Sequence, residues 1–220
     1  MHQIIRVQVV DDHAVVRFGL KCIFESCPDV EVVAESDCGE CATDDYMEHQ
    51  PDIVMMDLNM PGMGSMEAMR HILARNPHAK IVVLSFYDSS TMISRVMQSR
   101  AMGYLCKECN PTVLIEAVRQ VAHGNKYIDP TLASRMAEEG ISSASEPLRR
   151  LTMREFEIFL MLADGESAKD IAKTLHLSPN TVRNHQNSIM HKLNIRNKAE
   201  LVHIALQARL LSESPHGESR

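Results

Sequence analysis

The feature that most constrains the fold is a regular alternation of short apolar runs and amphipathic segments through residues 1–123. Short apolar runs bounded by polar residues are typical of strands buried on both faces, and the longer segments have helical spacing. The predicted strands are Ile5–Val10, Glu31–Ala34, Ile53–Met56, Ile81–Leu84 and Gly103–Cys106. The predicted helices cover about His13–Glu25, Gly39–Glu48, Ser65–Arg75, Thr91–Arg100 and Pro111–His123. This series predicts an α/β domain whose five-stranded parallel sheet has the flavodoxin-like order 2-1-3-4-5.

Residues 124–147 have a different character. The stretch GISSASEP at 140–147 is short, polar and rich in serine, which is typical of a linker. A helical stub at Pro130–Glu139 precedes it. We therefore predict that residues 124–147 connect two domains.

Residues 148–211 contain four segments that each begin with a helix-capping residue. Thr152 and Glu155 have capping-box spacing, and Ser167, Ser178 and Asn197 stand at the other three starts. A tight turn near His176–Leu177 separates the second helix from the third. The pattern predicts a small all-α four-helix domain with a helix-turn-helix, followed by a flexible tail at 212–220.

Charge divides the chain in the same way. The formal net charge of -6 argues weakly against nucleic-acid binding. However, residues 1–123 hold 10 Lys+Arg against 17 Asp+Glu, whereas residues 148–211 hold 10 against 6. An acidic first part and a basic last part indicate two modules with different partners.

No apolar run approaches the roughly 18–20 residues that a membrane helix needs. The N-terminus carries acids where a signal peptide would have its apolar core. We therefore expect no membrane association and a cytoplasmic location.

Polar side chains follow four of the predicted strands. Asp11 and Asp12 follow the first strand, Asp57 the third, Ser85 the fourth and Lys107 the fifth. In the order 2-1-3-4-5 these ends are neighbours, so the side chains converge at one edge of the sheet. Clustered carboxylates repel one another and need a cation, and oxygen ligands suit Mg²⁺. The set fits phosphoryl chemistry, although each aspartate taken alone also fits a solvated turn.

The predicted helix 179–193 has two unlike faces. At 100° per residue, Val182, His185, Ile189 and Leu193 share one side, which predicts a packed face. The opposite side carries Asn180, Arg183, Asn184, Asn187 and His191. Amides and a guanidinium suit base edges, and Ser178, Thr181 and Lys192 suit phosphates. A solvated polar face on an ordinary helix is the alternative.

Six cysteines include two pairs with C-x-x-C spacing, namely Cys38/Cys41 and Cys106/Cys109. One zinc ion cannot join the two pairs, because they follow opposite edge strands that are about 19 Å apart at four strand spacings. We expect structural free thiols in a reducing compartment, with redox tuning beside Lys107 as the alternative.

Residues 4–123 resemble the receiver domain of two-component response regulators. The matching residues are Val-Val-Asp-Asp-His at 9–13, Met-Met-Asp-Leu-Asn-Met-Pro-Gly at 55–62, Leu-Ser at 84–85 and Gly-Tyr-Leu-Cys-Lys at 103–107. The resemblance implies that Asp57 is the phospho-acceptor and that Ser85 and Lys107 contact the phosphoryl group. It also implies that Tyr104 is an aromatic switch that turns inward. The implied Mg²⁺ ligands are Asp11, Asp12, Asp57 and the Asn59 backbone carbonyl.

Three positions depart from the receiver pattern, and one of them is Glu108, which follows Lys107 where many receivers have proline. Phe86 stands beside Ser85, where smaller residues are usual, and is expected to slow access to the phosphoryl site. Ser65 replaces a common glycine, and its hydroxyl is expected to cap a helix.

Residues 149–211 resemble the LuxR-type helix-turn-helix domain. The matching residues include Leu151-Thr-x-Arg-Glu155, Gly165, Ile171-Ala172, Leu177-Ser178, Asn180–His185, Lys192–Ile195 and Ala199-Glu-Leu201. The resemblance implies that the third helix enters the major groove, with Arg183, Asn184 and Asn187 as base readers. It implies phosphate contacts by Lys169, Asn180, Thr181 and Lys192. It further implies that the fourth helix pairs two monomers on an inverted repeat.

Together the two matches predict a NarL/FixJ-type response regulator, a transcription factor rather than an enzyme. Such a protein is phosphorylated on Asp57 by a sensor histidine kinase with Mg²⁺, and then dimerises on DNA and contacts RNA polymerase. Phe86 and the cysteines motivate an alternative, a phosphorylation-independent regulator controlled by protein contacts. A hydrolase is disfavoured, because the pocket lacks a separate acid/base residue for turnover.

Overall fold

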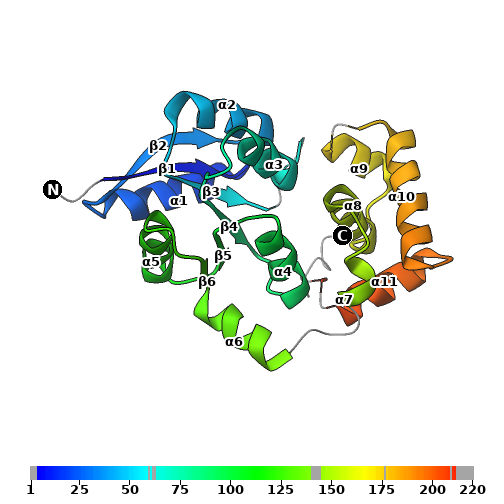
Figure 1. Cartoon of the computed structure of the whole chain (residues 1–220). Helices are drawn as coiled ribbons and strands as arrows, with labels where there is room; N and C mark the ends of the chain where they lie inside the picture. The colour runs from blue at the N-terminus through cyan, green and yellow to red at the C-terminus, as the bar shows by residue number, and fades with distance from the viewer. Residues whose placement is uncertain are drawn as a thin grey trace, which may run out of the picture. The chain divides into compact units, whose positions relative to one another are not determined.

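The structure is a computed structural model of the 220-residue chain, and it describes residues 4–58, 60, 63–139, 145–175, 177–208 and 210–211. It divides into two compact units, Met1–Glu138 and Glu139–Arg220 (Figure 1). None of the helices in the described ranges is long and apolar enough to cross a membrane. Asn59, His176, the linker residues 140–144 and the predicted tail 212–220 lie outside the described residues.

The first unit is a parallel sheet with alternating helices. Its strands are β1 (Ile5–Val10), β2 (Val30–Ser36), β3 (Ile53–Asp57), β4 (Ile81–Ser85), β5 (Gly103–Cys106) and β6 (Tyr127–Ile128). Its helices are α1 (Ala14–Glu25), α2 (Gly39–His49), α3 (Ser65–Arg75), α4 (Ser90–Gln98), α5 (Pro111–Ala122) and α6 (Pro130–Glu139). The strand order is β2-β1-β3-β4-β5-β6, and all neighbours are parallel. The predicted order of the first five strands is confirmed.

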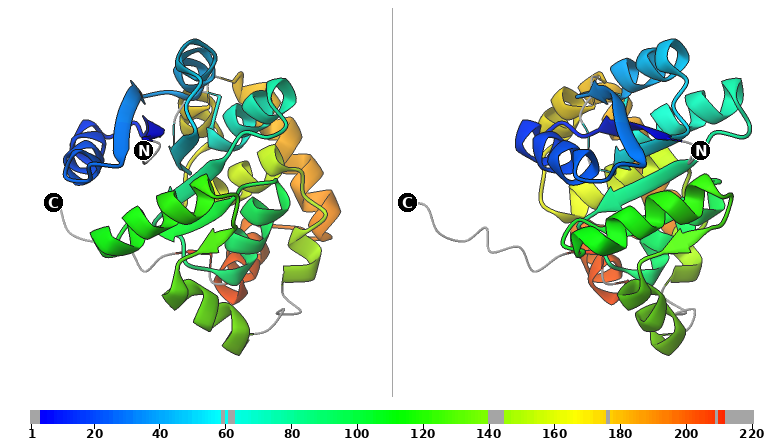
Figure 2. Two further views of the ribbon diagram at one scale, coloured as in Figure 1. Left: turned by 60° about the vertical axis from the view of Figure 1, so that its left-hand side comes forward. Right: turned by 90° about the vertical axis from the view of Figure 1, so that its left-hand side faces the viewer.

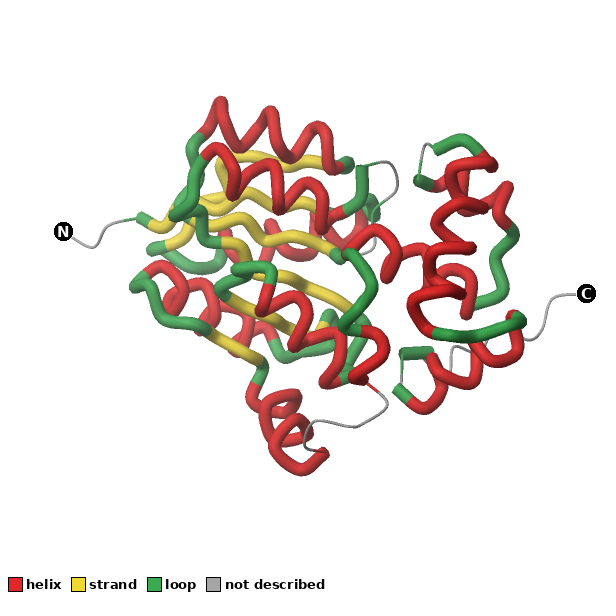
Figure 3. Tube along the Cα trace, turned by 45° about the vertical axis from the view of Figure 1, so that its right-hand side comes forward, coloured by secondary structure: helices red, strands yellow, loops and turns green. Residues whose placement is uncertain are grey.

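Helices cover both faces of this sheet (Figures 2 and 3). On one face, Phe24 of α1 and Val118 of α5 join a core with Val9, Met55 and Leu105. On the other face lie the buried residues of α2, α3 and α4, such as Tyr46, Ile72 and Val96. Strands β3 and β4 are buried at every residue, which is why each is a continuous apolar run up to its last residue.

A sixth strand extends the predicted sheet. Tyr127 and Ile128 pair with Gly103 and Tyr104 of β5, and the Tyr127 N–H donates to the Met102 carbonyl at 2.9 Å. This pairing satisfies the backbone groups at the edge of β5. A two-residue strand is too short to show a periodicity, so no pattern in the sequence predicts it. The compact unit therefore extends through α6 to Glu138, beyond the predicted boundary at 123.

The second unit is helical, with α7 (Ser145–Leu148), α8 (Met153–Ala163), α9 (Ala168–Thr174), α10 (Pro179–Leu193) and α11 (Lys198–Gln207). The predicted caps are confirmed, since the side chains of Thr152, Ser167, Ser178 and Asn197 each accept a backbone hydrogen bond. The short helix α7 is an addition to the four predicted helices and begins inside the predicted linker. Its Leu148 is fully buried, which ties it to this unit.

The expectation of six free thiols is wrong for one pair. Cys38 and Cys41 are joined by a disulfide whose Cα atoms are 5.2 Å apart. Cys38 is the N-cap of α2 and Cys41 is three residues further on, and the first turn of the helix brings those two positions together. Cys22, Cys27, Cys106 and Cys109 are free.

Candidate functional sites

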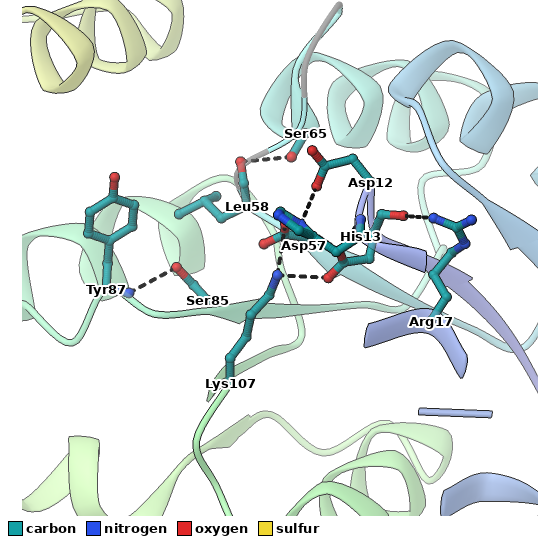
Figure 4. A network of polar contacts seen from close by, with 10 residues as sticks. Asp12, His13, Arg17, Asp57, Leu58, Ser65, Ser85, Tyr87 and Lys107 are labelled. Carbon is teal, nitrogen blue, oxygen red and sulfur yellow. Dashed lines mark hydrogen bonds and ion pairs between the residues drawn. The ribbon is translucent and has the colours of Figure 1, made fainter. Parts of the chain in front are cut away.

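The polar residues at the strand ends do converge. Lys107 follows β5, and its Nζ lies 2.7 Å from Asp11 Oδ2 and 2.9 Å from Asp57 Oδ2 (Figure 4). The three side chains are almost fully buried, with 4%, 1% and 3% exposed. Residues separated by up to 96 positions are therefore brought together at one edge of the sheet, as the sequence predicts.

Negative charge exceeds positive charge in this pocket. Burial alone would lower the pKa of Lys107, but its hydrogen bonds and charge interactions with Asp11 and Asp57 raise that pKa, so the side chain stays protonated. Ligand atoms of Asp11, Asp12, His13 and Asp57 all lie within 4.8 Å of one another. Three carboxylates with a single ammonium group fit a divalent cation that prefers oxygen ligands.

Two neighbours hold the aspartates in place. The His13 N–H donates to Asp11 Oδ1 at 2.8 Å, and His13 Nδ1 lies 2.8 Å from Asp12 Oδ1. The Arg17 guanidinium donates to the Asp11 carbonyl at 2.6 Å. His13 is recognisable in the sequence only as part of the motif at 9–13. Arg17 was not predicted, although it follows His13 by four residues, which is about one helical turn.

Ser85 and Tyr104 are both buried next to the pocket. In Figure 4 the Ser85 hydroxyl points to the backbone of Tyr87, whose N–H donates to it at 3.1 Å. The Tyr104 ring is fully buried and its hydroxyl donates to the Tyr87 carbonyl at 2.8 Å. Burial raises the pKa of Tyr104, although its hydrogen bond with Ser85 opposes the shift. Tyr104 thus already has the inward position that its predicted switch role requires.

Leu58, directly after Asp57, is tied to the start of α3 by Ser65. The buried Ser65 hydroxyl donates to the Leu58 carbonyl at 2.8 Å, across the loop. The N-cap of α3 is Gly64, and Ser65 is the first residue of that helix. The expected helix-capping role of Ser65 is therefore wrong, because its hydroxyl binds the loop.

Phe86 lies over the pocket lysine. Its ring centroid is 5.3 Å from Lys107 Nζ, within cation–π range, while 59% of the side chain is exposed. A large, partly exposed apolar ring therefore lies beside the ammonium group. That it slows access to the pocket stays a prediction.

Helix α10, the third of the four predicted helices, has the two predicted faces. Val182, Ile189 and Leu193 are buried, and His185 is half-buried beside them. The exposed residues are Ser178, Asn180, Arg183, Asn184, Asn187 and His191, and Lys169 of α9 is exposed too. Thr181 is half-buried, and its hydroxyl lies 2.8 Å from that of Ser178. The predicted base-reading and phosphate-binding groups are thus available at the start and along one side of α10.

Lys192 differs, because it has an intramolecular partner. Its Nζ lies 2.6 Å from Oε2 of Glu155, a carboxylate that is buried at the start of α8. Glu155 also accepts from the Ser188 hydroxyl at 2.6 Å and from the Thr152 N–H at 2.6 Å. Burial alone would raise the pKa of Glu155, but the bonds from Lys192, Ser188 and Thr152 outweigh it and lower that pKa to about 2. This network joins α8 to α10.

Comparison with protein families decides what the two units are. Residues 7–119 match the family model described as response regulator receiver domain. Residues 149–205 match the model described as bacterial regulatory proteins, luxR family. This chain belongs to the response regulators. The first unit is its receiver domain, and the second is its LuxR-type helix-turn-helix domain.

Similar response regulators match over nearly the whole length. The oxygen regulatory protein NreC of Staphylococcus carnosus is 38% identical, over 94% of this chain and 99% of its own. The response regulator UvrY of Escherichia coli is 37% identical, over 92% and 94%. A solved structure of two RcsB dimers bound to two parallel DNAs is 26% identical, with a TM-score of 0.60 and coverage of 93% and 99%.

The sequence does not predict the contacts of two residues that support the sites of this response regulator. Arg17 binds a pocket aspartate through the aspartate's backbone carbonyl, and Glu155 binds α10 through Lys192 and Ser188. Glu155 was recognised only as a helix cap, because its second role depends on residues 33 and 37 positions away.

Proposed function

We propose that this response regulator is switched by phosphorylation of Asp57 and then binds DNA as a dimer to control transcription. In this proposal a sensor histidine kinase donates the phosphoryl group and the protein acts in the cytoplasm. The observation that carries the proposal is the buried pocket in which Asp57 shares Lys107 with Asp11. A reactive carboxylate beside a fixed ammonium group and further carboxylates is what phosphoryl transfer needs.

The chain's own groups have separate roles in the proposed transfer. A carboxylate oxygen of Asp57 attacks phosphorus, the bond from phosphorus to the donor nitrogen breaks, and the donor imidazole keeps the electron pair and takes up a proton. Lys107 then pairs with a phosphoryl oxygen, and the Ser85 hydroxyl leaves Tyr87 to donate to another. Asp11, Asp12, Asp57 and the Asn59 carbonyl would hold Mg²⁺, which supplies positive charge against the negative charge that develops.

The direct test is labelling of the full-length protein by a small phosphodonor. Acetyl phosphate with Mg²⁺ is expected to add one phosphoryl group, which peptide mass spectrometry places on Asp57. In parallel, the labelled protein is used to select bound fragments from random DNA, which identifies the operator sequence. Absence of Mg²⁺-dependent labelling would favour the alternative, a regulator controlled by protein contacts, which the bulky Phe86 at the pocket motivates.

Magnesium is expected to stabilise the receiver domain. Because the folded pocket gathers carboxylates that the unfolded chain separates, Mg²⁺ at about 100 times its Kd adds about 2.7 kcal/mol to the free energy of unfolding. The melting temperature of wild type should therefore rise with MgCl₂ and not with NaCl of equal ionic strength. Asp12→Asn should reduce this rise, and a variant that responds like wild type would contradict the assigned ligand set.

Arg183 is expected to carry sequence recognition. Arg183→Ala should weaken operator binding about 10- to 100-fold, because a bidentate contact from arginine to guanine is worth about 1–3 kcal/mol. Electrophoretic mobility shifts with the selected operator and with a scrambled duplex measure the loss. The matched control is Arg75→Ala, which removes an exposed arginine from the receiver domain. An equal loss on both duplexes would show that Arg183 contacts only phosphate.

Among the proposed phosphate contacts, Lys192 differs because it already forms an ion pair with Glu155. A phosphate bound by Lys192 would leave a buried carboxylate with less positive charge, at a substantial free-energy cost. We therefore assign Lys192 to the positioning of α10, and we keep Lys169, Ser178, Asn180 and Thr181 as the proposed phosphate contacts. Dimerisation through α11 and contact with RNA polymerase complete the proposal.

A further inference from the structure

The disulfide Cys38–Cys41 encloses two residues that touch the loop following the proposed phospho-acceptor. The Met63 N–H donates to Oε1 of Glu40 at 3.0 Å. A Cβ atom on Gly39 would lie 3.3 Å from Met63 Cβ and 3.3 Å from the Gly64 carbonyl oxygen. The backbone of α2 at Gly39 is therefore in close contact with Met63 and Gly64, the residues just before α3.

Leu58 is held by a separate hydrogen bond. The Ser65 hydroxyl donates to the Leu58 carbonyl, directly after Asp57. Leu58 is thus held by Ser65, whereas Met63 and Gly64 are held by Gly39 and Glu40. The second attachment depends on the conformation of residues 38–41.

We propose that Cys38 and Cys41 are a redox-active dithiol–disulfide pair whose oxidation fixes Met63 and Gly64, just before α3, and whose reduction loosens them. The oxidant is a low-molecular-weight disulfide. The Cys38 thiolate attacks one of its sulfurs and releases one thiol, and the Cys41 thiolate then attacks Cys38 and releases the second. Two protein thiols lose two protons and two electrons in total, and one external disulfide becomes two thiols.

The local structure suits this exchange. Cys38 caps an 11-residue helix and its sulfur accepts from the Cys41 N–H at 3.1 Å, a position that favours the thiolate form. Both residues are partly exposed, so a small disulfide can reach them. In the reduced form Cys38 can still cap the helix, so reduction changes the link between the cysteines without unfolding α2.

The second C-x-x-C pair does not share these properties. Cys106 and Cys109 are free, and Cys106 is the last residue of β5 rather than the cap of a helix. Burial, together with the charges of Asp129 and Cys106, raises the pKa of Cys109 to about 11. The spacing alone therefore does not make a pair redox-active in this protein.

The test compares reduced and oxidised full-length protein without any phosphodonor. The protein is equilibrated with glutathione and glutathione disulfide at a series of ratios, alkylated, and mapped by peptide mass spectrometry. Amide exchange of Met63 is measured for each form, and Mg²⁺ affinity is measured by calorimetry. We expect Cys38 and Cys41 to become protected from alkylation together as the share of glutathione disulfide rises. We expect the Met63 amide to exchange at least about threefold more slowly in the oxidised form. We also expect Mg²⁺ to bind about threefold more tightly to that form, because a fixed loop is preorganised.

Variants separate the disulfide from its effect on the loop. Cys38→Ser with Cys41→Ser keeps a capping oxygen and should give Met63 the reduced rate at every glutathione ratio. Glu40→Gln should still form the disulfide but show a smaller change at Met63. Cys22→Ser, which removes an exposed free thiol, is the matched control and should behave as wild type.

Three results would overturn the proposal. The pair could remain reduced at all ratios, or oxidise without changing Met63 exchange. The reduced protein could also bind Zn²⁺ stoichiometrically through Asp37, Cys38 and Cys41, whose ligand atoms lie within 4.8 Å of one another, and then resist oxidation. The extension to Mg²⁺ rests on the proposed function, whereas thiol mapping and Met63 exchange do not. A redox effect on Met63 with no Mg²⁺ binding would therefore identify the proposed function as the part that failed.

Discussion

Asp57→Asn is expected to abolish the gain in operator affinity that acetyl phosphate and Mg²⁺ give to the wild-type protein. Asparagine has nearly the same shape but lacks the nucleophilic oxygen, so no acyl phosphate forms. If the DNA-binding form is at most about 10% populated before phosphorylation, a complete shift raises the apparent affinity at least about tenfold. The variant should keep its basal affinity and lose all of that gain in an operator titration.

The control for this experiment has the same change in charge at a different place. Asp44 is an exposed residue of α2, so Asp44→Asn should respond to the phosphodonor as wild type does. Circular dichroism of all three proteins checks that the fold is intact. Equal donor-induced gains in wild type and Asp57→Asn would contradict the phosphorylation switch and would favour control by protein contacts.

The second large effect is expected on the stability of the helix-turn-helix domain. Glu155→Gln removes the charge from a carboxylate that joins α8 to α10 and leaves Lys192 without its partner. The pKa of Glu155 is lowered from 4.5 to about 2, and that difference corresponds to about 3 kcal/mol of folding free energy at neutral pH. Hydrogen exchange of the α8 and α10 amides in the full-length protein should show this loss, while the receiver sheet remains unchanged.

The effect should depend on pH in a defined direction. Because the pKa of Glu155 is lower in the folded state, its stabilisation is fully present above about pH 4.5 and is lost as the pH falls toward 2. The difference between wild type and Glu155→Gln should therefore shrink below pH 4.5. A difference of the same size at pH 7 and pH 3 would show that the charge of Glu155 is not its source.

Glu166 provides a matched substitution in the same domain. It is half-buried, and burial together with Asp164 and Asp170 raises its pKa. Its charge is therefore unfavourable in the folded state, so Glu166→Gln should be neutral or slightly stabilising. Opposite outcomes for the two glutamates would separate the Glu155 network from a general effect of removing negative charge.

The sequence by itself determined the elements and the ends of the strands. Buried parallel strands must be apolar on both faces, and helix starts need side-chain oxygens, so β1 to β5, α1 to α5 and the caps of α8 to α11 are all visible as local patterns. The pocket followed as well, because the carboxyl ends of neighbouring parallel strands must meet at one edge. Asp11, Asp57 and Lys107 could thus be placed together from their positions after strands.

Only the tertiary structure decided the contacts that have no local pattern. The strand β6 exists because β5 offers it an unpaired edge, and the pairing of Cys38 with Cys41 required the actual first turn of α2. Lys192 contacts a carboxylate 37 residues away, a partner that its place in the sequence does not indicate. The periodicity of a sequence indicates which side of a helix or strand is buried. Which residue of another helix or strand it contacts is set by how whole elements pack.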